Sequence, residues 1–376
     1  MTIDKYIGNP EAFPILRHWD FFNHAAVCPL PHVTAEVLRS FATQAEDASY
    51  VDSGWYPQVE ALRDSTAKLI HCDRDEVALV KNTSEGLSTV AQGIDWRPGD
   101  RIVTTAFEYP ANMYPWMDLA RRKHIEFATV IPQTEAILAA LDHPKTRMLS
   151  LSHVQFASGQ RHDLVTIGQF CRQRGILFCI DAIQSLGVLP VDVRQMQIDF
   201  LSADGHKWLL GPEGAGIFYC RRELAAQVHP PMIGWLNVTK SSDYDHYDFT
   251  LRPDARRFEC GTHNVPGFLM LKASIDLLLE VGIQAISARI KALTDQLVEG
   301  LQHSGCKIAS PRDHEQWSGI VSFDCPSGRN QELVASLRKD HRVELVVRGG
   351  RVRASPHFYN TEAQIERLIE LVKASS

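Results

Sequence analysis

The sequence predicts an α/β fold in which a mainly parallel sheet lies between helices, followed by a smaller α+β domain. Strand-like and helix-like segments alternate from about residue 75 to residue 220, which is typical of βαβ units. Many of the strand-like segments are nearly continuous apolar runs, as expected for strands that are covered on both faces. After about residue 265, two long helical patterns replace this alternation.

The alternating region begins with a short apolar run and a helical pattern, DEVALV (75–80) and SEGLSTVAQGI (84–94). Further strands are expected at residues 100–109, 125–131, 147–154, 176–181, 198–204 and 216–220. Helices are expected at residues 134–143 and 164–175, and the second should end at Gly175, since glycine readily adopts the conformation of a helix C-terminus.

The last third of the chain has a different pattern. Helices are expected at 268–282, 283–305 and 361–375, and shorter strands at 319–325 and 342–348. We therefore expect a large domain over residues 20–264 and a small α+β domain over residues 265–376, with the N-terminal segment 1–19 joining the small one.

Composition excludes several classes of protein. With 44% hydrophobic and 22% charged residues, the chain is typical of a soluble globular protein. A net charge of −6 and the lack of a Lys/Arg block argue against nucleic-acid binding. No apolar run is long enough to predict a membrane span, and the first residues do not have the pattern of a signal peptide. The eight cysteines form no CxxC pair or Cys/His cluster, so we expect reduced thiols, no metal site and a cytoplasmic location.

Two ionisable residues follow strands that look buried. Asp181 ends the run ILFCID, and Lys207 follows IDFLSAD. Ligands of open α/β sheets bind beyond the carboxyl ends of the strands. A desolvated lysine there becomes a nucleophile for carbonyl compounds, including pyridoxal phosphate, and Asp181 is a suitable acidic partner for the pyridine nitrogen. Gln184 can reach the same site. Taken singly, a surface lysine and a helix-capping aspartate explain these positions equally well.

A phosphate needs hydrogen-bond donors, and the stretch KNTSEGLSTV provides them. Thr83 and Ser84 come after a strand and at the start of a helix, where backbone N–H groups and the helix dipole favour an anion. An ordinary helix cap is the alternative. His206, next to Lys207, can donate a further hydrogen bond.

Arginines cluster near the C-terminus, in VVRGGRVRASPHFYN. They stand at positions 348, 351 and 353, and arginine binds carboxylates through two parallel hydrogen bonds. A solvated strand edge is the alternative. Because the run is apolar on its N-terminal side, we expect at least one of these side chains to point inward.

With these residues identified, the chain resembles the class V aminotransferase family of pyridoxal phosphate enzymes with the type I fold. It is most similar to the branch of cysteine desulfurases, selenocysteine lyases and isopenicillin N epimerase. The resemblance extends from FFNHAAVCPLP (21–31) to RASPHFYNTEAQI (353–365). Its most specific part is IDAIQSLGVLPVDV (180–193) followed by DFLSADGHKWLLGPEGAGIFY (199–219). It implies a seven-stranded, mainly parallel sheet in the large domain.

The resemblance also implies roles for individual residues. Lys207 matches the lysine of the internal aldimine, Asp181 the partner of the pyridine nitrogen, and Gln184 the neighbour of the phenolic oxygen. The implied cofactor-binding set is Thr83, Ser84, Tyr109, His153, Gln155, Asp181, Gln184, His206, Lys207 and Thr262.

Thr262 matches a residue that reaches the phosphate of the neighbouring subunit, which implies a homodimer with shared sites. On the substrate side, Arg353 matches the carboxylate clamp, and Arg348 is a second candidate. Asn23 and His24 lie in the N-terminal segment that lines the substrate.

Three departures from the family pattern affect the expected chemistry. The stretch VVRGGRVRAS lacks the nucleophilic cysteine of cysteine desulfurases, which argues against persulfide formation by that route. The stretch FEYPAN has no histidine to stack on the cofactor, which leaves Tyr109 or Pro110 in that place. Phe156 stands where many relatives have asparagine.

The implied function is catalysis on an amino acid or related amine through a Lys207 aldimine and a carbanion. We expect an aminotransferase-type reaction. The alternatives are a C–S or C–Se lyase or an epimerase without the loop cysteine, and a binding protein without turnover. The presence together of Asp181, Lys207, Thr83 and Arg353 argues against the last.

Overall fold

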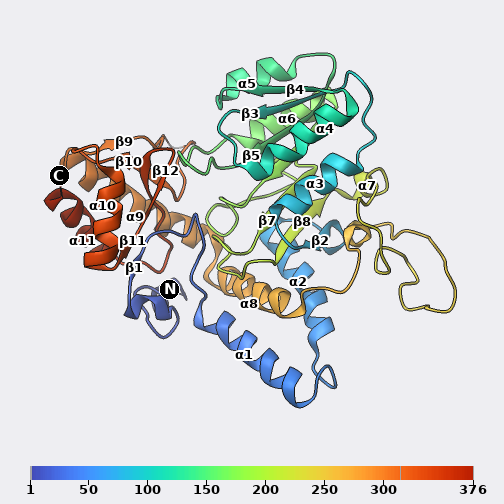
Figure 1. The fold of residues 1–376 in the computed structure, drawn as a ribbon, viewed down its shortest axis with the longest axis horizontal. Helices are drawn as coiled ribbons and strands as arrows, with labels where there is room; N and C mark the ends of the chain where they lie inside the picture. The colour runs from blue at the N-terminus through green and yellow to red at the C-terminus, as the bar shows by residue number, and fades with distance from the viewer. Residues whose placement is uncertain (1, 314, 376) are drawn as a thin grey trace.

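The computed structural model describes residues 2–313 and 315–375. Its largest element is a seven-stranded sheet in the order β2-β8-β7-β6-β5-β3-β4 (Figure 1). Strands β3 to β7 pair in parallel, whereas β8 runs antiparallel to both β7 and β2. The strands are β2 (Val77–Val80), β3 (Arg101–Thr105), β4 (Glu126–Val130), β5 (Thr146–Ser152), β6 (Leu177–Asp181), β7 (Phe200–Asp204) and β8 (Gly216–Cys220). This confirms the mainly parallel seven-stranded sheet.

Helices cover both faces of this sheet. They include α2 (Trp55–Ile70), α3 (Thr83–Gly93), α4 (Tyr114–Lys123), α5 (Thr134–Leu141), α6 (Leu164–Arg174), α7 (Arg222–Ala225) and α8 (Val265–Val281), and α1 (His32–Asp47) packs against α8. Alternate residues of β6 enter different cores: Phe178 and Ile180 pack with α2, α6 and α8, and Cys179 packs with α3 and α4. Burial on both faces explains the continuous apolar runs of the strands.

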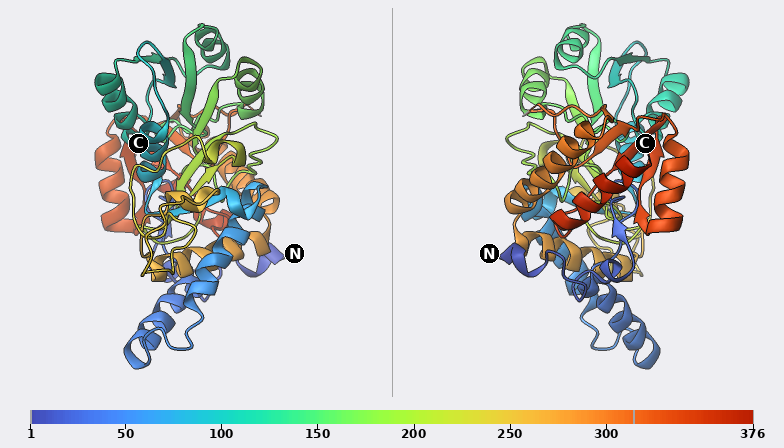
Figure 2. Two further views of the ribbon diagram at one scale, coloured as in Figure 1. Left: turned by 90° about the vertical axis from the view of Figure 1, so that its right-hand side faces the viewer. Right: turned by 90° about the vertical axis from the view of Figure 1, so that its left-hand side faces the viewer.

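A smaller sheet forms near the C-terminus. Its four antiparallel strands have the order β12-β13-β10-β9, and α9, α10 and α11 share its core. The elements are α9 (Ile283–His303), β9 (Lys307–Ile308), β10 (Val321–Asp324), α10 (Asn330–His341), β12 (Val346–Arg348), β13 (Arg351–Ala354) and α11 (Glu362–Ala374). The views of Figure 2 show this part beside the large sheet, and α1 and α2 projecting from the body as a hairpin.

The prediction of a single strand over residues 342–348 is wrong. The structure divides it at Leu345 into β11 (Val343–Glu344) and β12, because the two halves pair with different strands. Strand β11 lies parallel to β1 (Asp20–Phe21), whereas β12 pairs with β13. Arg348, the last residue of β12, lines the site described below.

The limits of the two domains do not follow from these elements alone. Helix α8 starts just beyond the expected boundary at 264/265, yet Leu271 and Ile275 pack in the core of the large sheet. Phe22, which falls in the expected large domain, packs instead with the small sheet. The division of the chain at 264/265 stays a prediction.

The described residues contain neither a membrane-spanning helix nor a metal-binding cluster. Within that part of the chain, no helix combines the length and apolar character needed to cross a membrane. No group of three or more His, Cys, Asp and Glu side chains there is arranged to hold a metal ion. The eight cysteines are all free thiols, and six of them are buried.

Candidate active site

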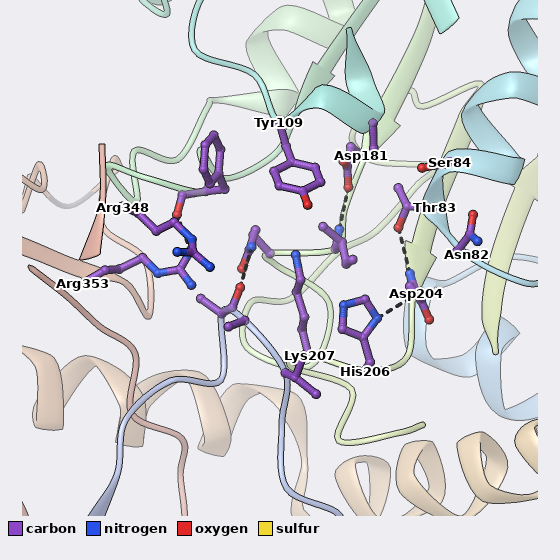
Figure 3. A pocket seen from close by; sticks show the side chains of 17 residues that line it. Asn82, Thr83, Ser84, Tyr109, Asp181, Asp204, His206, Lys207, Arg348 and Arg353 are labelled. Carbon is purple, nitrogen blue, oxygen red and sulfur yellow. Dashed lines mark hydrogen bonds and ion pairs between the residues drawn. The ribbon is translucent and has the colours of Figure 1, made fainter. Parts of the chain in front are cut away.

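A cavity of about 410 Å³ lies where the parallel strands of the large sheet end, between that sheet and the small one (Figure 3). Nine of the residues expected at the site line it: Thr83, Ser84, Tyr109, Asp181, Gln184, His206, Lys207, Arg348 and Arg353. They come from segments up to 270 residues apart in the chain. The crossover connections put successive strand ends at one edge of the sheet, which brings these segments together.

Lys207 lies three residues beyond the end of β7, and only 8% of its surface is exposed. Burial lowers the pKa of its amine to about 8; Asp181 opposes this shift, and Arg353 and Arg348 add to it. The Nζ atom is 5.4 Å from the centre of the Tyr109 ring. Roughly a tenth of the amine is therefore neutral, and hence nucleophilic, at neutral pH, whereas an ordinary lysine is almost wholly protonated there.

Asp181 is the last residue of β6 and is 1% exposed. Burial raises the pKa of its carboxyl group to about 7, and the N–H of Ile183, which donates to Oδ1 at 3.0 Å, opposes that shift. A cation bound next to this carboxylate would offset the cost of its burial.

A close backbone approach and the side chain of Gln184 hold together the segments that carry Asp181 and Lys207. Gly187 has φ of 94°, and a Cβ atom there would lie 2.2 Å from the carbonyl oxygen of Trp208. Gln184 accepts a hydrogen bond from Trp208 Nε1 (2.9 Å) and donates one to the carbonyl of Ala25 (3.0 Å). Only glycine fits at 187, so this close approach fixes the positions of both loops.

The N-terminus of α3 forms one end of the cavity. Asn82 caps the helix by accepting from the N–H of Glu85 at 3.0 Å. Thr83 Oγ1 accepts from the N–H of Asp204 (3.0 Å), which leaves its own hydroxyl hydrogen for a ligand, and His206 Nδ1 lies 3.0 Å from Asp204 Oδ2. A helix N-terminus with a threonine hydroxyl and a histidine is suited to a phosphate.

Arginines form the opposite end. Arg353, on β13, is 1% exposed and donates through Nη1 to the carbonyl of Phe156 at 2.7 Å. Its Nε and Nη2 atoms are buried without a partner among the described residues. Burial lowers the pKa of this guanidinium to about 9, and Arg348 adds to that shift. Unpaired buried donors of this kind indicate a site for an anion.

Two residues expected at the cofactor do not line the cavity. His153 lies instead in a separate depression with Arg161 and His162, where burial lowers its pKa to about 3. The amide of Gln155 donates to Thr105 Oγ1 (3.0 Å) and Glu108 Oε1 (3.2 Å). The segment after β5 presents Phe156 to the cavity, whereas His153 and Gln155 lie outside its lining, contrary to the expected geometry. Their contact with the cofactor stays a prediction.

The N-terminal segment also differs from expectation. The ring of His24 is buried between the carbonyl of Ser355 (2.9 Å) and the hydroxyl of Tyr359 (2.7 Å). Asn23 donates to Glu344 Oε1 at 3.3 Å. The residues that reach the cavity are their successors, Ala25, Ala26 and Val27, so Asn23 and His24 anchor the segment rather than line the site.

Thr262 lies apart from the cavity, exposed in a surface depression that Lys81 and Glu85 also line. Thr262 does not line the cavity of its own chain.

Three residues of the site and its surroundings were not predicted from the sequence. Asn82 and Asp204 line the cavity, and their signals were a helix-capping residue and a carboxylate that ends a buried strand. Glu108 accepts hydrogen bonds from Thr105 (2.6 Å), Asn112 (3.2 Å) and the backbone of Ser152 (2.9 Å), and so fixes the loop of Tyr109. No pattern of spacing identifies such a partner set.

The family model "Aminotransferase class-V" matches residues 22–368. The chain belongs to this family. Family membership confirms the resemblance, the type I fold and the pyridoxal phosphate cofactor that the sequence predicted. The chain is therefore a pyridoxal phosphate enzyme.

Curated relatives and solved structures agree with this assignment. A probable cysteine desulfurase of Pyrococcus abyssi is 32% identical over 84% of this chain and 83% of its own. Isopenicillin N epimerase of Streptomyces clavuligerus is 30% identical over 92% of both chains. The apo structure of a cysteine desulfurase from Thermococcus onnurineus NA1 is 26% identical and superposes with a TM-score of 0.88 over 97% of this chain and 96% of that one. The cystine C–S lyase C-DES, in complex with cysteine persulfide, is 25% identical with a TM-score of 0.87 over 96% and 99% of the two chains.

The cavity fits pyridoxal phosphate on its own chemistry. The α3 end offers donors for a phosphate, and Lys207 is an amine with a lowered pKa. Asp181 is a buried carboxylate without a hydrogen-bonded cation among the described residues. When bound, the cofactor supplies an aldehyde that combines with amines and a ring that accepts electrons from a broken bond at Cα.

Proposed function

We propose that this chain catalyses an aminotransferase-type reaction on an amino acid bound in the cavity. The observation that carries the proposal is the presence of Lys207, Asp181 and Arg353 in one cavity. Their chemistries are those of a proton-transfer group, a partner for a ring cation and a carboxylate clamp.

Each residue has a distinct task in this proposal. The free Nε and Nη2 atoms of Arg353 lie on one edge of the guanidinium and bind the α-carboxylate through two hydrogen bonds. This contact orients the α-proton toward Lys207, and a fixed geometry lowers the barrier. The Nζ atom of Lys207 removes and returns that proton, which its lowered pKa permits. Asp181 stabilises positive charge on the ring nitrogen.

A second candidate is a C–S lyase or epimerase, which the names of the relatives favour. The residues above serve these reactions equally, because all of them begin with loss of the α-proton. No cysteine lines the cavity among the described residues, which argues against transfer of sulfur to a cysteine of this chain.

A panel of amino acids and cysteine derivatives tests the choice. It measures keto-acid formation with exchange of the amino group, release of pyruvate or sulfide, and loss of optical rotation. Exchange of the amino group supports transfer. Sulfide release or racemisation at a rate above that of exchange would refute it in favour of the second candidate.

The lowered pKa of Lys207 predicts a pH dependence for cofactor attachment. Only the neutral amine attacks the aldehyde, so the rate of covalent attachment to cofactor-free protein should rise with pH through about 8 and then level off. The absorbance change after mixing with pyridoxal phosphate measures this rate. A rate that still rises at pH values well above 8 would show an amine with an ordinary pKa and contradict the prediction.

We also propose a homodimer in which Thr262 binds the phosphate in the partner's cavity. Thr262 is exposed and lies apart from the cavity of its own chain, as such a role requires. Thr262→Ala should weaken pyridoxal phosphate binding without changing the mass measured by sedimentation. Full cofactor occupancy in a monomeric protein would rule this role out.

We propose a cytoplasmic location for the enzyme, which the eight free thiols support because such thiols persist in a reducing compartment. A cysteine of the protein isolated from its host cells found in a disulfide would contradict this location.

A further inference from the structure

The three arginines of the β12–β13 hairpin have different surroundings. Arg351 is ion-paired with Asp324 Oδ2 at 3.3 Å. Arg348 and Arg353 instead line the cavity (Figure 3), and neither has a carboxylate within ion-pairing distance among the described residues. The register pairs Arg348 with Arg351 and Val346 with Arg353, so all three arginines leave the hairpin on one face. Arg351 is held there by Asp324, whereas Arg348 and Arg353 reach the cavity.

Two guanidinium groups without a carboxylate partner repel each other. The effect appears at Arg353, whose pKa is lowered first by burial and then by the charge of Arg348. The same two cations also lower the pKa of Lys207. An arrangement that is unfavourable in the empty protein becomes favourable once anions bind.

A single bound carboxylate does not use all the free N–H groups of Arg348 and Arg353. Arg353 has Nη1 on the carbonyl of Phe156, and its remaining edge, Nε with Nη2, holds one carboxylate. Arg348 is exposed at the end of β12 and donates through Nη1 to the carbonyl of Val347, which leaves its other N–H groups for a ligand. The second arginine is thus available for a second anion nearer the cavity mouth.

We propose that the substrate is an amino acid whose side chain carries a second carboxylate, which Arg348 binds while Arg353 binds the α-carboxylate. The proposal rests on the proposed function. It assigns Arg348 to substrate specificity and leaves the proton transfer at Lys207 unchanged.

Pairs of acidic amino acids and their amides test the proposed role of Arg348. L-aspartate and L-glutamate are compared with L-asparagine and L-glutamine, which have nearly the same shape and no side-chain charge. In the wild-type protein, the acids should have higher kcat/KM and should bind more tightly in titrations that follow the cofactor absorbance. Arg348→Gln should lower kcat/KM for the acids by about 10-fold or more, mainly through KM, and leave the amides unchanged.

Arg351→Gln is the control, because Arg351 lies on the same hairpin and pairs with Asp324 rather than lining the cavity. It should leave both classes of substrate unchanged. An equal loss for acids and amides in Arg348→Gln would show that Arg348 acts on the α-carboxylate, and would overturn the proposal. A wild-type protein that prefers the amides would overturn it too, while the proposed function stands. A protein whose cofactor absorbance responds to no amino acid would overturn both.

Discussion

Lys207→Ala should purify without covalently attached cofactor and should lose amino-acid turnover. Proton transfer by a positioned side chain typically contributes about 10²- to 10⁴-fold to rate, and loss of the amine removes that contribution. The pocket at the α3 end, with Thr83 and His206, does not involve Lys207, so non-covalent binding of the cofactor should persist. Absorbance after gel filtration and borohydride reduction followed by peptide mapping measure the two properties.

Lys207→Arg is the matched variant, since it retains a cation but has no amine that deprotonates near neutral pH. It should lose covalent attachment and turnover as Lys207→Ala does. Reduced cofactor attached to another lysine in either variant, with turnover near the wild-type rate, would show that Lys207 is not the reactive amine.

Asp181→Asn should keep the cofactor attached to Lys207 and lower kcat. The variant removes a carboxylate that is 1% exposed and faces the cavity, while an amide oxygen can still accept from Ile183. Truncating one partner of a buried charge pair costs about 2–5 kcal/mol, which is roughly 30-fold to several thousand-fold in rate. Steady-state kinetics and the absorbance of the bound cofactor are the measurements.

Asp199→Asn controls for the loss of a buried carboxylate as such. Asp199 precedes β7 at its other end and pairs with Arg172 (3.1 Å) and Arg221 (2.7 Å), away from the cavity. We expect it to lower thermal stability with little change in kcat. If both variants lower kcat equally and in step with their melting temperatures, the carboxylate of Asp181 acts only on the fold.

The sequence predicted those parts of the fold that depend on the burial of one short segment. Apolar runs buried on both faces predicted β5, β6 and β7, because a strand between two layers of helices has no polar face. Polar residues at the ends of those strands then predicted Asp181 and Lys207 at one site. The helices α1, α2, α4 and α10 were not predicted, and β11 and β12 were read as one strand, because their limits depend on pairing and packing partners.

The sequence by itself determined the fold class, the family and the residues that meet at the α3 end, because strand order and a helix start place them. The tertiary structure decided which members of a polar stretch face the cavity. Phe156 faces it rather than Gln155, whose amide donates to Glu108, and Ala25 faces it rather than His24, whose ring lies between Ser355 and Tyr359. His153 lines a separate depression with Arg161 and His162. It also separated the three arginines, because Asp324 pairs with Arg351 and leaves Arg348 and Arg353 to the cavity. Such choices depend on partners distant in the chain, which local sequence does not contain.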